Sequence, residues 1–477
     1  MIPIINRLKY CLSILFVVVF LSACNMGKKY QRPELGLPTD FKTNQVQSFG
    51  DTSSIADIEW KKFFTNPALQ MLIDKGLQHN NDLKVAIRRL DIAQLQVTQS
   101  KALSLPAVDL NVSGSIQRPS DNSLAGISIE SFLGKTYVEN YNAGITVSWE
   151  ADIWGKIRGR KEVALTEYLH TGEAVKAVQT QLVANIAQDF FMLLMLDRQL
   201  EITRENLALS DSFVVITRLL KDAGLGNALA VQQAESQRIA TALLIPQLQQ
   251  DIVVRENSLQ LLTGQYPDTI MRSITLDDLE LPAIYSAGLP VAMVARRPDV
   301  RMAELSLVAA NAEIGIAQAN MYPTLNLVAG TGLESFMASN WFSIPGSLFG
   351  MGAGAIVQPI FRRKELKTRY EVAKLEREIA VHQFRESVLI ATSEVVNALS
   401  HIEKLSQQEE LLIIQTDTLR RAVFNARLLF KSDMANYLEV ITAQGVAIRA
   451  ELSLAEIQRQ QLEAMVELYR SLGGGWK

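Results

Sequence analysis

The strongest constraint on the fold is that the sequence contains one pattern twice. A shift of 217 positions superposes Asp82 on Asp299 and Pro106 on Pro323, and a shift of 209 superposes Arg218-Leu219-Leu220 on Arg427-Leu428-Leu429. The small drift between the shifts is what insertions in surface loops produce. The chain is therefore predicted to hold two tandem repeats, residues 80–263 and 298–477, joined by a linker over 264–297.

Within each copy the hydrophobic period changes from helical to alternating. Residues 80–104 and 298–321 read as helices, because each ends just before a proline. Strict alternation then predicts a β-hairpin at about 107–149 in the first copy and at about 324–358 in the second. Apolar side chains that alternate with small or polar ones over about ten residues are typical of membrane β-strands. A soluble amphipathic hairpin would show the same alternation.

Each hairpin is followed by a long stretch with the period of an α-helix. No proline interrupts residues 156–221 or 363–431. At 1.5 Å per residue such helices are about 100 Å long, which favours a coiled-coil or tubular assembly over a globular core. Short breaks at 223–226 and 432–436 precede return helices at about 228–263 and 437–472, and the chain ends in a short tail, Gly473-Gly474-Gly475-Trp476, predicted to be unstructured.

The N-terminus has the layout of a lipoprotein signal peptide, residues 1–23. Arg7 and Lys9 precede a short apolar run that ends in Leu21-Ser22-Ala23-Cys24. That run is too short for a transmembrane helix, and small residues before a cysteine predict cleavage and lipidation at Cys24. Residues 24–79 are then an extended lipidated segment followed by a first short helix.

Composition argues against several classes of function. The formal net charge is −3, whereas nucleic-acid-binding domains are usually basic. Two cysteines and four histidines, without metal-ligand spacing, offer no metal site, and no nucleophile or phosphate-loop motif stands out. We therefore expect neither an enzyme nor a cofactor.

Four strands cannot close a barrel, and open sheet edges are not tolerated in lipid. If the strands span a membrane, several chains must combine them, and three chains supply 3 × 4 = 12 strands, an even number in the range of such barrels. Trp149, Trp154 and Trp341 are then candidates for the membrane interface, although the first two could pack a hairpin against a helix.

The chain resembles the TolC-like outer-membrane efflux proteins, most closely their lipoprotein branch. The resemblance rests on the lipobox and five further segments: Tyr30-Gln31-Arg32-Pro33, Trp60-Lys61-Lys62-Phe63, Trp149-Glu150-Ala151-Asp152-Ile153-Trp154-Gly155, Arg296-Arg297-Pro298-Asp299-Val300-Arg301 and Tyr437-Leu438-Glu439-Val440. It implies a mainly α homotrimer whose 12-stranded β-barrel in the outer membrane continues as an α-helical barrel in the periplasm. The expected partners are outer-membrane lipid, a periplasmic adaptor protein and an inner-membrane transporter, and transport through the duct is passive.

The resemblance also implies that the two helix–turn–helix breaks form periplasmic tips that dock the adaptor. The tip residues would be Ala223, Gly224 and Leu225 in the first copy, and Asp433 and Met434 in the second. The family usually has glycine where this chain has Asp433, so the second tip carries an extra charge. Any helix hairpin favours a glycine, so Gly224 by itself indicates only a turn.

Just after the second tip the family narrows its resting channel with acidic rings. The matching positions are Glu439 and Thr442, so this chain retains one of the two usual carboxylates. Arg427 and Arg218 lie near the same end and could pair with Glu439 or with other tip carboxylates. The alternative for Glu439 is a solvated carboxylate on the outside of a helix.

Two other functions remain open at this point. A duct for type I protein secretion would use the same fold. A periplasmic coiled-coil scaffold lipoprotein would need no pore, but it would have no use for the alternating hairpins.

Overall fold

A computed structural model describes residues 26–36, 54–272, 274–279, 290–432 and 434–476. Cys24 and Asp433 lie outside these residues. The contacts divide the chain into two compact units, each assembled from three separate stretches. Unit 1 comprises residues 1–33, 91–169 and 304–383, and unit 2 comprises residues 34–90, 170–303 and 384–477.

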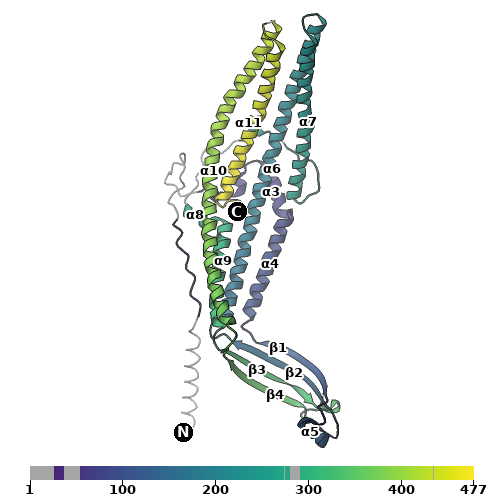
Figure 1. Ribbon diagram of the computed structural model, residues 1–477, viewed down its shortest axis with the longest axis vertical. Helices are drawn as coiled ribbons and strands as arrows, with labels where there is room; N and C mark the ends of the chain where they lie inside the picture. The colour runs from purple at the N-terminus through teal and green to yellow at the C-terminus, as the bar shows by residue number, and fades with distance from the viewer. Residues whose placement is uncertain (1–25, 37–53, 273, 280–289, 433, 477) are drawn as a thin grey trace. The chain divides into compact units, whose positions relative to one another are not determined.

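Unit 1 contains one antiparallel sheet in the order β1-β2-β3-β4 (Figure 1). Its strands are β1 (Ala107–Gln117), β2 (Val138–Ala151), β3 (Thr324–Ser335) and β4 (Leu348–Val357). Both expected hairpins are confirmed, and they pair with each other through β2 and β3. The first hairpin also contains a helix that the sequence analysis did not predict, α5 (Leu124–Leu133), which is capped by the Ser123 hydroxyl.

The register determines which side chains share a face of the sheet. Leu110 lies opposite Ile145, and Val147 lies opposite Ala329, so the apolar sets of β1, β2 and β3 share one face. On β4 the apolar residues point the other way, because Met351 lies opposite Gly330. The glycines on that second face leave the space that the larger β4 side chains occupy.

The long helices have the expected bounds, and the sequence of each is divided between the two units. They are α4 (Asn81–Ala102), α6 (Lys156–Asp222), α9 (Pro298–Ala319) and α10 (Glu365–Lys431). α6 and α10 are 67 residues each, and their return helices α7 (Ala228–Leu262) and α11 (Tyr437–Ser471) are 35 residues each. None of the described helices combines the length and the apolar content needed to cross a bilayer.

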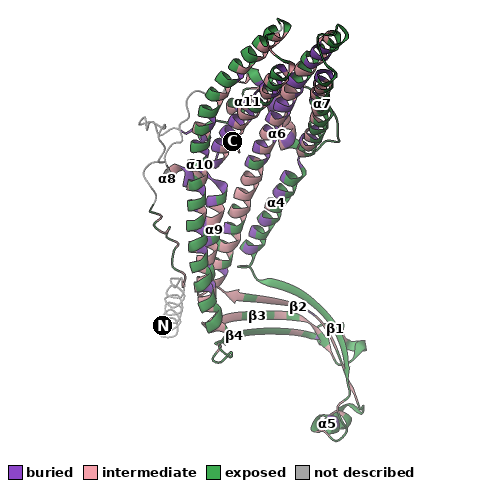
Figure 2. Cartoon of the chain, turned by 45° about the horizontal axis from the view of Figure 1, so that its top comes forward, coloured by how far each residue is buried: buried purple, intermediate pink, exposed green. Residues whose placement is uncertain are grey.

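Unit 2 holds most of the buried core. Ile186, Phe190 and Leu193 of α6 are fully buried, and Figure 2 shows buried residues concentrated along this helix. Shorter elements pack here too: η1 (Ile55–Asp57), α2 (Trp60–Phe63), α3 (Pro67–His79), η2 (Leu276–Asp278) and α8 (Pro290–Arg296). α3 begins sharply, because Asn66 caps it and Pro67 fits its first turn.

The prediction of an unstructured C-terminal tail is wrong. Residues 472–475 are buried, and the Trp476 indole donates to the Gly473 carbonyl at 2.9 Å. The Lys176 ammonium lies 4.5 Å from the centre of the Trp476 ring. Glycine-rich composition suggested a free tail, but here the small residues permit close packing against Tyr469 and Thr180.

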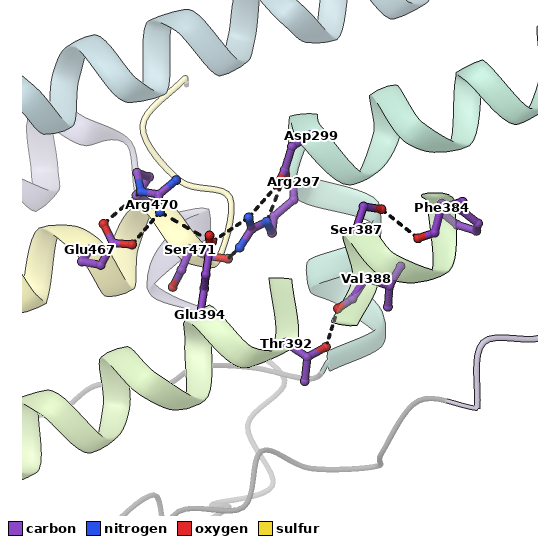
Figure 3. A network of polar contacts seen from close by, with 10 residues as sticks. All are labelled: Arg297, Asp299, Phe384, Ser387, Val388, Thr392, Glu394, Glu467, Arg470 and Ser471. Atoms are coloured by element: carbon purple, nitrogen blue, oxygen red, sulfur yellow. Dashed lines mark hydrogen bonds and ion pairs between the residues drawn. The ribbon is translucent and has the colours of Figure 1, made fainter. Parts of the chain in front are cut away.

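A network of charged side chains joins α9, α10 and α11 within unit 2 (Figure 3). Arg297, whose side chain is 4% exposed, makes a bidentate pair with Asp299 and an ion pair of 2.8 Å with Glu394. Its third contact is a 2.9 Å hydrogen bond to the Ser471 carbonyl. Burial alone would lower the pKa of Arg297, but its acidic partners outweigh burial and raise the pKa. The guanidinium therefore stays charged in the core.

Candidate functional sites at the helix tips and the sheet

The two helix tips of unit 2 are built in the same way. In the first, the Leu225 amide donates to the Leu220 carbonyl at 2.9 Å and Gly224 has φ +76°, a conformation that costs glycine little. In the second, the Met434 amide donates to the Leu429 carbonyl, also at 2.9 Å. The 209-residue shift superposes these two bonds.

Asparagine side chains start both return helices. The Asn227 carboxamide oxygen accepts from the Ala230 amide, and that of Asn436 accepts from the Leu438 and Glu439 amides. These caps hold the turns while the tip side chains face solvent. Ala223 and Gly224 are exposed, and Leu225 and Met434 are 79% and 76% exposed. Two large apolar side chains are thus displayed where a solvated turn would favour polar ones.

Two of the three predicted gate residues share one face of α11, and the third, Arg427, lies on α10. Glu439 and Thr442 are both exposed and lie three positions apart, so they project from the same side of the helix. Arg427 is half-buried on α10, and among the described residues no carboxylate lies within ion-pair distance of it. An Arg427–Glu439 pair within one chain is therefore not formed.

The duplication explains this difference between the two arginines. Arg218 pairs with Glu235 of α7, as the sequence analysis allowed for a tip carboxylate. The same shift places Arg427 against Gln444, which carries no charge. Gln444 is buried, and its side-chain nitrogen has no hydrogen-bond partner in the described structure.

A groove of about 620 Å³ lies between the two tips. Residues from both copies line it: Thr217, Leu220, Leu225, Gly226, Asn227, Ala230, Phe430, Lys431, Met434, Ala435, Asn436, Tyr437 and Glu439. Beneath it, Phe213, Val214, Ala234 and Val440 form a small buried core, with Phe430 5.3 Å from Phe213 between ring centres. This core fixes the two helical hairpins beside each other.

Most apolar side chains of the sheet in unit 1 are exposed rather than buried. Val108, Leu110, Val112 and Ile116 of β1 are between 63% and 71% exposed. Within the described part of the chain, β1 and β4 each pair with one strand only, which leaves two open edges of 11 and 10 residues. Exposed edges of this length beside an apolar face are a template for pairing with further strands.

Aromatic side chains cluster at both ends of this sheet. At the end where the helices begin, Trp154 lies 4.9 Å from Tyr322 and donates to the Pro323 carbonyl at 2.7 Å. At the other end, Trp341 lies 5.3 Å from Tyr141. Tyr141 and Trp149 are eight residues apart on one face of β2, which is about 26 Å along a strand. That separation matches an apolar band flanked by two aromatic girdles.

The sequence analysis missed the contact that fixes the N-terminal segment to unit 1. Arg32 forms two hydrogen bonds of 2.6 Å with Glu304 of α9, whose side chain is 7% exposed, and Tyr30 donates to the same carboxylate. Burial and the charge of Glu304 raise the pKa of Tyr30 to about 12. The Tyr30–Pro33 motif signalled importance, but its partner is 272 residues away from Arg32.

Comparison with known proteins identifies the fold and the family. The family described as outer membrane efflux protein matches residues 72–265 and 289–474, most of the chain. The chain belongs to the outer membrane efflux protein family. In this family, the sheet of unit 1 and the paired hairpins of unit 2 are the expected architecture.

Individual relatives agree along their full length. The probable efflux pump outer membrane protein TtgC of Pseudomonas putida is 32% identical, with 98% of this chain and 96% of that protein covered. The cation efflux system protein CusC of Escherichia coli is 28% identical, with 97% and 98% covered. The solved open state of the Neisseria gonorrhoeae MtrE outer membrane channel is 25% identical with a TM-score of 0.84, and the match covers 95% of this chain and 99% of that structure.

Proposed function

We propose that this protein is the outer-membrane channel of a tripartite efflux pump. Three chains would pool their sheets into a 12-stranded barrel and their long helices into a periplasmic tube. The observation that carries this proposal is the sheet, which has an exposed apolar face, two unpaired edges and aromatic clusters at both ends. A scaffold without a pore would not need these features. Transport would be passive, because the relatives are efflux channels.

The proposed anchor is a lipid on Cys24, which follows the signal peptide. Several acyl chains on one cysteine hold a protein at a membrane durably. Arg32 is eight residues after Cys24, and its ion pair with Glu304 would connect the lipid anchor to α9.

The tips are proposed to dock the adaptor, which in turn binds an inner-membrane transporter. The groove between them is flanked by Leu225 and Met434, so a helical hairpin with apolar residues would find both shape and apolar contact there. In the sequence, Asp433 directly precedes Met434 and adds one charge to this tip segment.

Glu439 is proposed to form a ring of three carboxylates that narrows the channel near its periplasmic end. In this chain Glu439 is exposed and Arg427 lacks a partner among the described carboxylates. Both are therefore available to residues of a neighbouring chain. Three carboxylates facing one axis attract cations and repel each other, so the ring should make conductance cation-selective.

The test is single-channel conductance of the lipidated protein in planar bilayers, with Glu439→Ala compared with wild type. Glu410→Ala, which removes an exposed carboxylate from the middle of α10, is the matched control. We expect small, cation-selective conductance that rises or loses its selectivity only in Glu439→Ala.

Conductance unaffected by Glu439→Ala would keep the channel and remove Glu439 from the gate. If a folded, inserted trimer formed no channels, the channel itself would be refuted and a scaffold role would replace it.

A further inference from the structure

Two stretches rich in lysine and arginine follow the strands at one end of the sheet. Four of the six residues in 156–161 and five of the eight in 362–369 are basic. Ala107 pairs with Ser148, and Thr324 pairs with Val357. The strands β2 and β4 therefore finish at the same end of the sheet, and both basic stretches follow them there. We call residues 156–161 and 362–369 the basic collar.

Helix stability does not account for the collar. Both stretches lie at or just before the N-terminal turns of α6 and α10, where the helix dipole disfavours positive charge. The first turn of α6 has no acidic residue, and that of α10 has only Glu365. These cations therefore occupy positions where acidic or neutral residues would make a better helix.

The backbone of the second stretch also shows that the cations occupy unfavourable positions. Arg363 and Lys364 have φ of +48° and +67°, in the left-handed region that non-glycine residues rarely adopt. The 209-residue shift superposes Lys364 on Gly155, which has φ +78°. Where the first copy uses a glycine for the turn, the second accepts an unfavourable conformation and keeps a cation.

The collar cations differ in whether the described residues offer them a carboxylate. Lys156 pairs with Glu150 at 2.6 Å, and Arg369 pairs with Glu365 at 2.8 Å. Arg158, Arg362 and Arg363 are exposed, and none of them has a carboxylate within ion-pair distance among the described residues. They are free to neutralise negative charges from outside the chain.

The surroundings of the collar point to a lipid rather than a soluble anion. Ile360 and Phe361, immediately before Arg362, are 95% and 83% exposed. Apolar side chains followed directly by cations suit a membrane interface, where the former enter the acyl region and the latter reach the headgroups. Trp154 and Tyr322 lie at the same end of the sheet.

The N-terminal segment adds two cations at the same place. Gly27, Lys28 and Lys29 line a small pocket together with Trp154 and Arg158. The Asn311 side chain of α9 holds this segment by donating to the Lys28 carbonyl at 2.8 Å. In the sequence, Gly27 is three residues after Cys24, the proposed lipid anchor.

We propose that the basic collar binds the headgroups of anionic phospholipids in the membrane leaflet at this end of the sheet. The proposal rests on the proposed function, because it requires the sheet to span a membrane. Each phosphate would lie between cations of the two stretches, and the collar would set the depth of the sheet in the bilayer. A zwitterionic phospholipid with the same acyl chains should bind more weakly, because its own ammonium group competes with the collar.

The test is a lipid titration of the purified, detergent-solubilised full protein, followed by native mass spectrometry. Phosphatidylglycerol and phosphatidylcholine with identical acyl chains are the two probes, and the readout is the ratio of their binding constants. The test variant is Arg362→Gln with Arg363→Gln. The control is Arg204→Gln with Arg385→Gln, which removes one exposed cation from α6 and one from α10, both outside the collar.

We expect wild type and the control to prefer phosphatidylglycerol, and the preference to weaken at high salt. A cation near an anionic surface is worth about a fivefold change in binding, so removing two cations should lower that preference about 25-fold. Trimer retained in the same spectra shows that the variant is folded.

Three results would overturn the proposal. They are equal binding of the two lipids by wild type, an unchanged preference in the collar variant, and displacement of phosphatidylglycerol by millimolar inorganic phosphate, which would indicate a site for soluble anions. Wild-type conductance separates this failure from failure of the proposed function, because a conducting protein without lipid preference refutes only the collar.

Discussion

Arg297 offers the sharpest test of how the core of unit 2 is held together. Replacing it by methionine keeps the length and removes the charge, so Glu394 loses its 2.8 Å ion pair and the Ser471 carbonyl loses its 2.9 Å donor. Arg470 stays 3.5 Å from Glu394, too far for a good hydrogen bond. Glu394 is 32% exposed and therefore partly solvated, so the loss of the guanidinium should cost about 1.5–3 kcal/mol, the value of hydrogen bonds to charged groups.

Hydrogen exchange measures this loss locally. The amides at the start of α9 and the end of α11 should open more easily by about 1.5–3 kcal/mol, so they should exchange roughly 10- to 10²-fold faster. Adding Glu394→Gln to Arg297→Met should recover part of the protection, because the orphaned charge is then removed.

The matched control is the neighbouring residue, Arg296→Met. Arg296 pairs with Asp57 at 2.7 Å, but the two side chains are 22% and 40% exposed. Such a pair contributes about 1 kcal/mol or less. Equal exchange rates in both variants would refute the argument that burial makes Arg297 the stabilising residue.

Three smaller predictions follow from the same contacts. Burial alone would raise the pKa of Asp299, but its bonds to Arg297 lower that pKa below the usual 3.8. The carboxylate therefore stabilises the fold above pH 3.8, and this stabilisation is lost as the pH falls through the lowered pKa. The difference in melting temperature between wild type and Asp299→Asn, followed by circular dichroism, should shrink between pH 5 and pH 2.5, and a constant difference would contradict this prediction. Glu304→Gln should release the N-terminal segment, so that trypsin cleaves after Lys29 about tenfold faster than in Glu376→Gln, since a hydrogen-bonded charge pair is worth about 1.5–3 kcal/mol; equal rates would mean that Arg32 does not hold the segment. Gly224→Val should cost about 1–2 kcal/mol at the first tip, because valine disfavours positive φ, and faster exchange of the Leu225 amide than in Gly224→Asn is the expected sign.

Much of the secondary structure could be predicted from local pattern alone. The bounds of α6 and α10 follow from the helical period and the absence of proline. The starts of α7 and α11 follow from their asparagine caps. The strands follow from strict alternation. These signals are local, because each depends on residues a few positions apart.

Other features could not be predicted, because they depend on contacts between distant residues. The alternation in β4 does not predict which face of the sheet carries its apolar side chains. A shift of one residue in the register with β3 would move them to the other face. The glycines of the tail suggested disorder, but close packing against Tyr469 uses them for burial. Likewise, the 209-residue shift aligns Arg427 with Arg218, but the ion pair of Arg218 with Glu235 is known only from the fold.

The sequence by itself therefore determined the repeated order of helices and strands and the family resemblance, and it predicts an export signal, since these are carried by period, composition and short motifs. Only the tertiary structure decided which charges meet, such as Arg32 with Glu304 and Arg297 with Glu394, and which remain free in the basic collar. The physical reason is that a charge acts through its neighbours in space, and in this chain those neighbours are about 100 to 270 residues away in sequence.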